Sequence, residues 1–223
     1  MEVKSNQQKV KHVLHELPHH QQRFRWDCGV SCVLMVLPEP QRSLFLENFT
    51  SICQQEGFNQ STWTIDLCYL LKRFNVKHEM YTSTLGVNEE NKRHSYYKKI
   101  LDQDRERPRG VARAGRAATG CGAAGLPLVP HNKLGVELGR WLGSGYRGHY
   151  VVVCGVAGER VVFRDPAVSA RLCAVSDREL AHARAAPGTD ADVILVYADA
   201  PALSRRCCSA SCFLHTMLLY PAL

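Results

Sequence analysis

A cysteine at the start of an apolar helix is the clearest chemical feature of the sequence. Cys28 follows Asp27, a residue type common at helix N-caps, and precedes the apolar run from Val30 to Leu37. A thiol in the first turn feels the positive end of the helix dipole, which favours the nucleophilic thiolate. The alternative is that Cys28 is a small buried hydrophobic side chain, as most free cysteines are.

A base and a group to orient it occur together farther along the chain. His149 opens the apolar run His149 to Cys154, Asp165 closes a second run, and Gly158 lies between them at similar separations. A hairpin that turns near Gly158 brings His149 and Asp165 to the same open end. A carboxylate beside an imidazole fixes its tautomer and stabilises the imidazolium. Taken singly, His149 suits a strand-end surface residue, and Asp165 before Pro166 suits a turn.

A third group lies shortly before the cysteine. Gln22 can donate its side-chain amide towards an oxyanion formed beside the thiol. Gln21 is a second candidate for this role, and a solvated side chain is the simpler alternative. The expected site is therefore Cys28, His149, Asp165 and Gln22.

No metal or cofactor site is predicted. Cys28 and Cys32 lie one helical turn apart, and His19 or His20 could join them, but zinc sites usually show two close pairs of ligands. Cys32 is expected in the core. The acidic residues in the middle of the chain are not spaced as a pair that would hold catalytic metal ions. These residues are Asp66, Glu89, Glu90, Asp102 and Asp104.

Hydrophobic periodicity predicts alternating helices and strands. The expected helices are 28–37, 42–55, 61–74, 95–102, 132–142 and 176–185, the last with a Ser176–Glu179 capping box. The expected strands are 13–17, 77–82, 149–154, 160–164 and 193–197.

A chain of 223 residues fits one domain, expected at residues 12–198. Residues 1–11 are expected to be a disordered lead. From Arg105 to Gly125 the sequence is Arg, Ala and Gly with almost no large apolar residue, so a disordered insert is expected over 105–130. Residues 199–223 change character again and are expected to form a tail.

Charge and cysteine content restrict the partners and the compartment. The net charge of +7 comes largely from arginine runs without interleaved aromatic residues, so nucleic-acid binding is not expected. The polar N-terminus lacks a signal core, and no stretch is long enough for an integral membrane segment. The ten cysteines are therefore expected to be reduced, in a cytoplasmic or nuclear protein.

The order of these residues resembles known families. Gln22, Asp27-Cys28-Gly29, Gly148-His149-Tyr150 and Asp165-Pro166 follow the pattern of C39-like, papain-fold cysteine peptidases. The resemblance is closer to the guanylyl cyclase domain-containing family, over about residues 12–104 and 146–198. Its motifs are Trp26-Asp27-Cys28-Gly29, Trp63-Thr64-Ile65-Asp66-Leu67, Thr84-Leu85-Gly86-Val87, Gly148-His149-Tyr150 and Gly188-Thr189-Asp190.

The resemblance implies a papain-like α+β fold with a helix packed on an antiparallel sheet. It implies Cys28 as nucleophile, His149 as general base, Asp165 as orienting group and Gln22 as oxyanion donor. The implied function is a thiol hydrolase acting on a peptide or isopeptide bond, with a peptide or protein as substrate or partner. Two alternatives stay open: a guanylyl cyclase converting GTP to cyclic GMP, as the family name implies, and a non-catalytic protein-binding module.

Overall fold

A computed structural model of the chain describes residues 12–58, 62–82, 148–169, 171–185, 191–197 and 217–222. The predicted lead, the helices 95–102 and 132–142 and the insert at 105–130 lie outside these residues. The motifs Thr84–Val87 and Gly188–Asp190 lie outside them as well.

The described strands form one seven-stranded sheet with the order β2-β6-β7-β3-β4-β5, and β1 pairs separately with β3. All of the pairings are antiparallel. The strands are β1 Val13–Leu14, β2 His78–Tyr81, β3 His149–Ala157, β4 Arg160–Arg164, β5 Cys173–Ser176, β6 Val193–Val196 and β7 Met217–Ala222.

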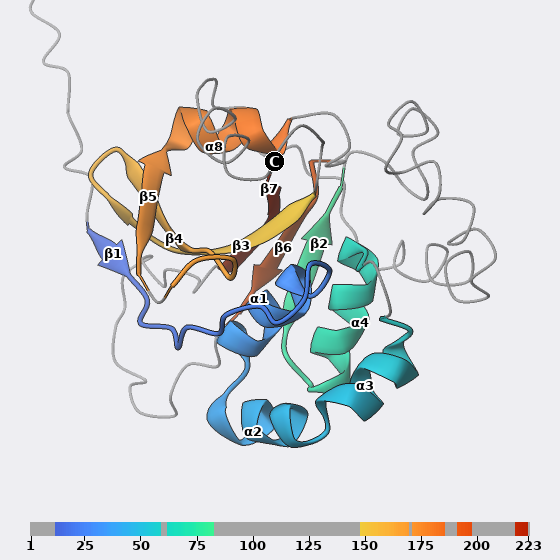
Figure 1. Cartoon of the computed structure of the whole chain (residues 1–223). Coiled ribbons are helices and arrows are strands. Elements are labelled where there is room, and N and C mark those ends of the chain that lie inside the picture. The colour runs from blue at the N-terminus through green and yellow to red at the C-terminus, as the bar shows by residue number, and fades with distance from the viewer. Residues whose placement is uncertain are drawn as a thin grey trace, which may run out of the picture.

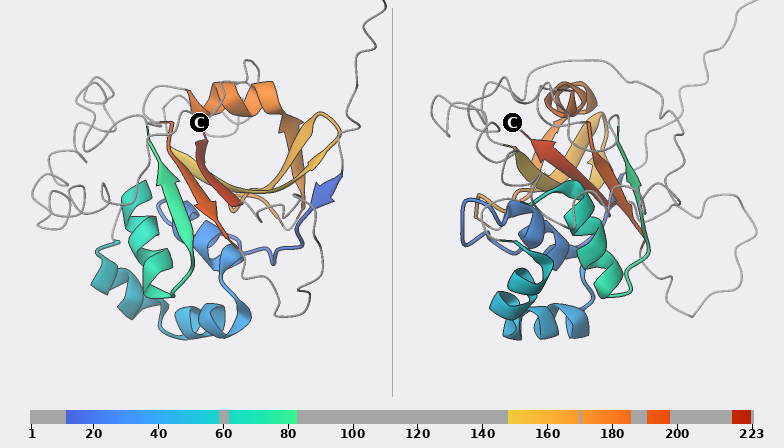
Figure 2. Two further views of the ribbon diagram at one scale, coloured as in Figure 1. Left: turned by 180° about the vertical axis from the view of Figure 1, so that it is seen from behind. Right: turned by 90° about the vertical axis from the view of Figure 1, so that its right-hand side faces the viewer.

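Helices cover both faces of this sheet. The described helices are α1 Cys28–Val36, α2 Glu39–Glu47, α3 Phe49–Glu56, α4 Thr64–Arg73 and α8 Asp177–Arg184. The first four lie together on one side of the sheet and α8 lies on the other, as the opposite views agree (Figures 1 and 2). The chain is thus an α+β protein in which α1 packs on the antiparallel sheet, as predicted.

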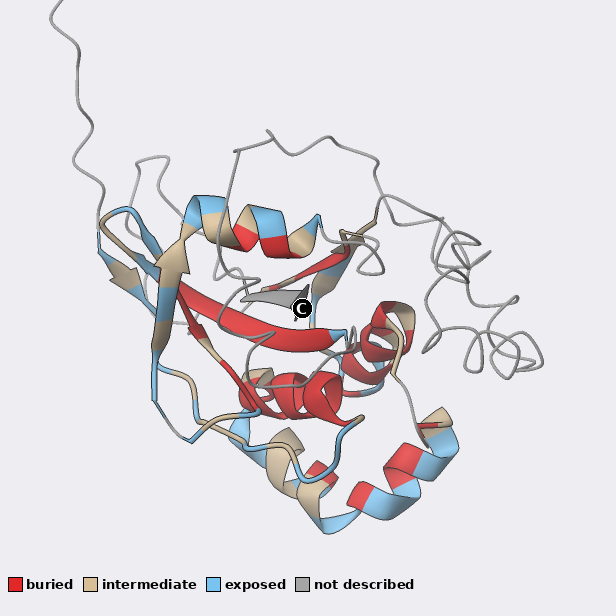
Figure 3. Ribbon diagram, turned by 45° about the horizontal axis from the view of Figure 1, so that its top comes forward, coloured by how far each residue is buried: buried red, intermediate tan, exposed pale blue. Residues whose placement is uncertain are grey.

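The continuous apolar run of β3 follows from this two-sided cover. Tyr150 and Val152 belong to the core beneath α1 to α4, whereas Val151 and Val153 belong to the core beneath α8. Alternate side chains of a strand point to opposite faces, so a strand covered on both faces needs apolar residues throughout. Figure 3 shows buried residues along both α1 and β3.

The strand β1 is shorter than the predicted strand 13–17, and it pairs with β3 at a glycine. Val13 is opposite Val156, and Leu14 is opposite Gly155, where the pairing of β3 with β4 shifts register. A side chain at Gly155 would collide with the backbone of Val13. This close approach ties the N-terminal segment to the strand that begins at His149.

The helix predicted over 42–55 is wrong in its limits. The second helix begins earlier, at Glu39, and Pro40 lies in its first turn, where its missing N–H costs nothing. Asn48 then separates α2 from α3. Its side-chain amide donates to the Leu44 carbonyl at 3.0 Å, a local bond that competes with regular helix.

The predicted tail contributes a strand. Met217–Ala222 forms β7, whose backbone pairs with β3 from His149 to Val153 and with β6 from Ile194 to Val196. This strand therefore lies inside the sheet, between β3 and β6.

Candidate functional site

Cys28 is the first residue of α1, in agreement with the predicted helix start, and is 4% exposed. An Asp before a helix commonly caps it with its side chain, but Asp27 does not. The Asp27 carbonyl accepts the Ser31 N–H at 2.8 Å, so Asp27 occupies the N-cap position, but its carboxylate makes no hydrogen bond to the helix.

The Asp27 carboxylate instead builds the loop before the helix. Its two oxygens accept the backbone N–H groups of Arg23 at 3.0 Å and Phe24 at 2.9 Å. Asp27 is buried, so these two bonds offset the cost of removing its charge from water. The loop they hold carries Phe24 stacked on Trp26, with ring centroids 5.6 Å apart.

Gly29 allows the cysteine-bearing end of α1 to dock closely. A Cβ at Gly29 would lie 2.7 Å from Leu67 of α4 and 3.1 Å from the Tyr150 ring of β3. Tyr150 is held by a buried hydrogen bond of 2.9 Å between its hydroxyl and that of Thr64. The helix end, α4 and the start of β3 therefore meet beside Cys28.

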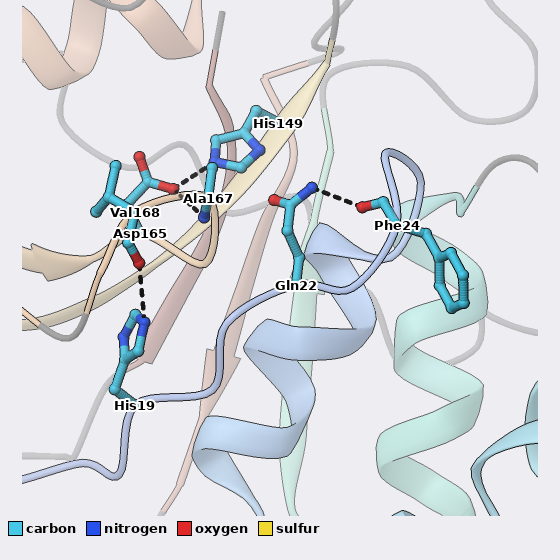
Figure 4. Close-up of polar contacts among 7 residues, drawn as sticks. All are labelled: His19, Gln22, Phe24, His149, Asp165, Ala167 and Val168. Carbon is cyan, nitrogen blue, oxygen red and sulfur yellow. Dashed lines mark hydrogen bonds and ion pairs between the residues drawn. The ribbon is translucent and has the colours of Figure 1, made fainter.

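His149 and Asp165 form a buried pair, as the hairpin argument predicts. His149 begins β3, Asp165 follows β4, and Nε2 of the imidazole lies 2.6 Å from Oδ1 of the carboxylate. The same oxygen accepts the Ala167 N–H at 2.8 Å. Figure 4 shows both bonds converging on Asp165, with the second ring nitrogen of His149 turned away from it.

Cys28 lies close to this pair, because the residues that follow Cys28 and His149, Gly29 and Tyr150, pack against each other. Burial alone lowers the pKa of His149, but the hydrogen bond to Asp165, the charge of Asp165 and the neighbouring Cys28 raise it to about 10. Burial likewise raises the pKa of Asp165, yet the hydrogen bond and charge of His149 outweigh it and hold that pKa below its usual value. At neutral pH the pair is therefore an imidazolium and a carboxylate.

The other thiols near the site lie in different surroundings. Burial raises the pKa of Cys32 well above its usual range, and Cys28 and Asp165 add to the effect. Burial also raises the pKa of Cys154, and it raises that of Cys53 to about 11. These three thiols are protonated at neutral pH and are poor nucleophiles.

Gln22 lies beside the pair, on the loop held by Asp27. Its backbone N–H donates to the Pro166 carbonyl at 2.9 Å, one residue after Asp165. Its amide Nε2 donates to the Phe24 carbonyl at 2.7 Å, whereas Oε1 is buried without a hydrogen-bond partner. In Figure 4 the side chain rises from the loop towards the side of His149. One N–H of the amide remains for another acceptor.

A surface groove of about 570 Å³ adjoins this arrangement. Its lining is Gln22, Arg23, Phe24, Arg25, Trp26 and Ala167. Gln22 and Ala167 belong both to the groove and to the surroundings of Asp165, so a molecule in the groove lies next to the site.

His19 contacts the Asp165 turn and was not identified from the sequence as part of this site. Its Nε2 lies 3.0 Å from the Val168 carbonyl oxygen. The sequence suggested His19 only as a metal ligand, and its contact with Val168 joins residues 149 positions apart, which no local pattern reveals. Within the described ranges, no group of three or more His, Cys, Asp or Glu side chains could hold a metal ion.

The helices of the described residues are all too short or too polar to cross a membrane. Comparison with solved structures finds no match.

Comparisons with known families and with known proteins agree with each other. The family described as "Guanylylate cyclase" matches residues 17–119 and 130–196. The protein "Guanylyl cyclase 1" of Arabidopsis thaliana is 35% identical over 213 residues, covering 81% of this chain and 75% of its own length. The family match includes Gln22, Cys28, His149 and Asp165. On these two matches, the chain belongs to the guanylylate cyclase family.

Proposed function

We propose that Cys28, His149 and Asp165 form a thiol hydrolase site that cleaves a peptide or isopeptide bond. The observation that carries this proposal is the buried His149–Asp165 pair, 2.6 Å apart, next to the start of α1, where Cys28 lies close enough to His149 to raise its pKa. A nucleophile, a base and a group that orients the base are the parts that covalent acyl transfer requires.

In the proposed reaction the Cys28 thiolate attacks the carbonyl carbon and forms a tetrahedral oxyanion. The His149 imidazolium protonates the leaving amine, the C–N bond breaks and a thioester with Cys28 remains. Water then attacks the thioester while His149 accepts its proton, and the C–S bond breaks, which releases the acid and restores the Cys28 thiolate and the His149 imidazolium. Asp165 keeps the imidazole oriented throughout.

Gln22 is the proposed donor to the oxyanion. Its unused amide N–H suits this role, and its Oε1, buried without a partner, accepts a hydrogen bond from the substrate or from water. The groove beside Gln22 is the proposed path of the substrate chain.

The first test is alkylation of the folded protein with iodoacetamide, read by mass spectrometry. Cys28 should label faster than Cys154, which is fully buried and has a raised pKa. His149→Ala should slow Cys28 labelling at neutral pH by about tenfold, the effect of losing one close charge worth roughly 1.4 kcal/mol.

His78→Ala is the control, because that imidazole lies on β2 and bonds only to its own segment at Val76. It should leave the labelling of Cys28 unchanged. If Cys28 labels no faster than Cys154, the proposed thiol chemistry is wrong, and a non-catalytic binding module becomes the better explanation of the fold.

The second candidate is a guanylyl cyclase that converts GTP to cyclic GMP. It is favoured by the family match and by the name of the Arabidopsis relative. Such a reaction usually employs metal ions held by acidic residues. Of the acids considered in the sequence, Asp66 is described: it is buried in the first turn of α4, with Oδ2 3.4 Å from the Trp63 N–H. The other four lie outside the described residues.

Cyclic GMP formation from GTP with magnesium or manganese separates the two candidates. The cyclase assignment predicts cyclic GMP formation that persists in Cys28→Ala. The thiol hydrolase assignment predicts no cyclic GMP, together with labelling of Cys28 by an electrophile that mimics an acyl substrate.

A further inference from the structure

The turn that carries Asp165 is attached to the segment before α1 at two points. The Gln22 N–H donates to the Pro166 carbonyl at 2.9 Å, and the His19 imidazole bonds to the Val168 carbonyl at 3.0 Å (Figure 4). The first is a backbone bond that any residue but proline can make. The second depends on the side chain of His19.

The position of His19 points to a role in the site. In Figure 4 His19 lies on the other side of Asp165 from His149, next to the turn that follows Asp165. Its Nδ1 is buried without a hydrogen-bond partner, so the Nε2 bond to Val168 fixes the ring. Both the imidazolium and the neutral tautomer with a proton on Nε2 can donate this bond.

We propose that His19 is a positioning residue, which fixes the turn 165–168 so that the Asp165 carboxylate stays on His149. The argument is geometric. One hydrogen bond of 2.6 Å links Asp165 to His149. The turn that follows Asp165 lies at the surface, where Ala167 is exposed. A turn held only at Pro166 can rotate about that point, which changes the distance from Asp165 to His149. The bond at Val168 restrains this rotation. The importance of the His19–Val168 bond for catalysis rests on the proposed function.

The experiment follows the titration of His149 by NMR in the full chain. The wild-type pKa is about 10 because of Asp165 and Cys28. In His19→Ala and His19→Phe, which lack the donor, the proton affinity of His149 should fall at least about tenfold, one pKa unit. His19→Gln keeps an N–H donor at similar reach and should restore most of the wild-type value.

His78→Ala is the matched control, since His78 makes the same kind of imidazole–carbonyl bond, at 2.8 Å to Val76, far along the chain from the site. It should not change the titration of His149. Thermal unfolding of each variant separates this specific effect from a general loss of stability.

Unchanged titration of His149 in a folded His19→Ala or His19→Phe variant would overturn the proposal. So would an equal shift in His19→Gln and His19→Ala, because the donor would then be irrelevant. If either variant that lacks the donor does not fold, the other serves with His19→Gln. Failure of the proposed function appears separately, as slow labelling of wild-type Cys28, and leaves the titration result intact.

Discussion

At the scale of single residues, His149 is the group whose charge interacts with both Asp165 and Cys28. It is buried, yet the hydrogen bond to Asp165 and the neighbouring Cys28 raise its pKa and keep it protonated at neutral pH. Residue spacing was sufficient to predict that His149 and Asp165 meet, whereas the catalytic roles of Cys28, His149 and Asp165 stay predictions. Residue type and spacing did not predict the role of Asp27, because an Asp before a helix can bond to the helix or to the preceding loop. The path of the loop decides between the two.

We expect the folded protein to lose stability between pH 7 and pH 10. The pKa of His149 is about 10 in the folded state, against an ordinary value of 6.5. The folded state thus holds this proton more tightly than the unfolded state. The resulting stability is complete below about pH 6.5 and disappears as the pH rises through 10. Urea unfolding at a series of pH values measures the slope.

The variant His149→Gln should flatten this dependence between pH 7 and pH 8.5. This pH range separates the effect of His149 from that of the buried thiols. The raised pKa values of Cys32 and Cys154 also make stability fall as the pH rises, but only near and above the ordinary thiol pKa of 9.0. An identical slope in the variant and the wild type would contradict the assignment of the imidazolium.

At the scale of elements, the site depends on how closely α1 docks between α4 and β3. We expect Gly29→Ala to destabilise the protein by about 1–3 kcal/mol, because the added methyl group overlaps Leu67 and the Tyr150 ring. Urea unfolding provides the measurement.

Ser31→Ala is the control in the same helix. The Ser31 hydroxyl is buried without a hydrogen-bond partner, so its removal should leave stability unchanged or raise it. A Gly29→Ala variant as stable as Ser31→Ala would show that α1 can shift, and that Cys28 is placed less rigidly than its packing indicates.

Elements with a strong local signal were predictable from sequence. The predicted capping box of α8 is confirmed, with the Glu179 N–H donating to the Ser176 hydroxyl at 3.2 Å. The predicted β3–β4 hairpin is also confirmed, although β3 continues to Ala157 rather than ending at Cys154. The strand β5 was not predicted, because its short segment from Cys173 to Ser176 becomes a strand through pairing with β4.

At the scale of the whole molecule, the described sheet consists of two parts joined by one strand. β2 and β6 lie on one side of β7, and β3, β4 and β5 lie on the other. Sequence analysis could not give this order, since strand pairing between distant segments has no local signature. The sequence therefore predicted a tail at 199–223, although residues 217–222 of it pair with β3 and β6.

We expect deletion of residues 217–223 to lower the free energy of unfolding by about 4 kcal/mol or more, because it removes two ladders of backbone hydrogen bonds and creates two unpaired edges. Thermal unfolding by circular dichroism measures the loss. Deletion of residues 1–11, the predicted lead, is the control and should change stability by less than about 0.5 kcal/mol. Equal effects of the two deletions would contradict a central position for β7.

The position of β7 also sets an order of events during synthesis. The helices α1 to α4 and the β3–β4 hairpin consist of contacts that can form as each segment leaves the ribosome. β3 and β6, however, become part of one sheet only when residues 217–222 pair between them as β7. Closing contacts between such distant segments is slow. Until that closure, the nascent protein exposes two open strand edges, which makes this interval the one in which a chaperone can matter most.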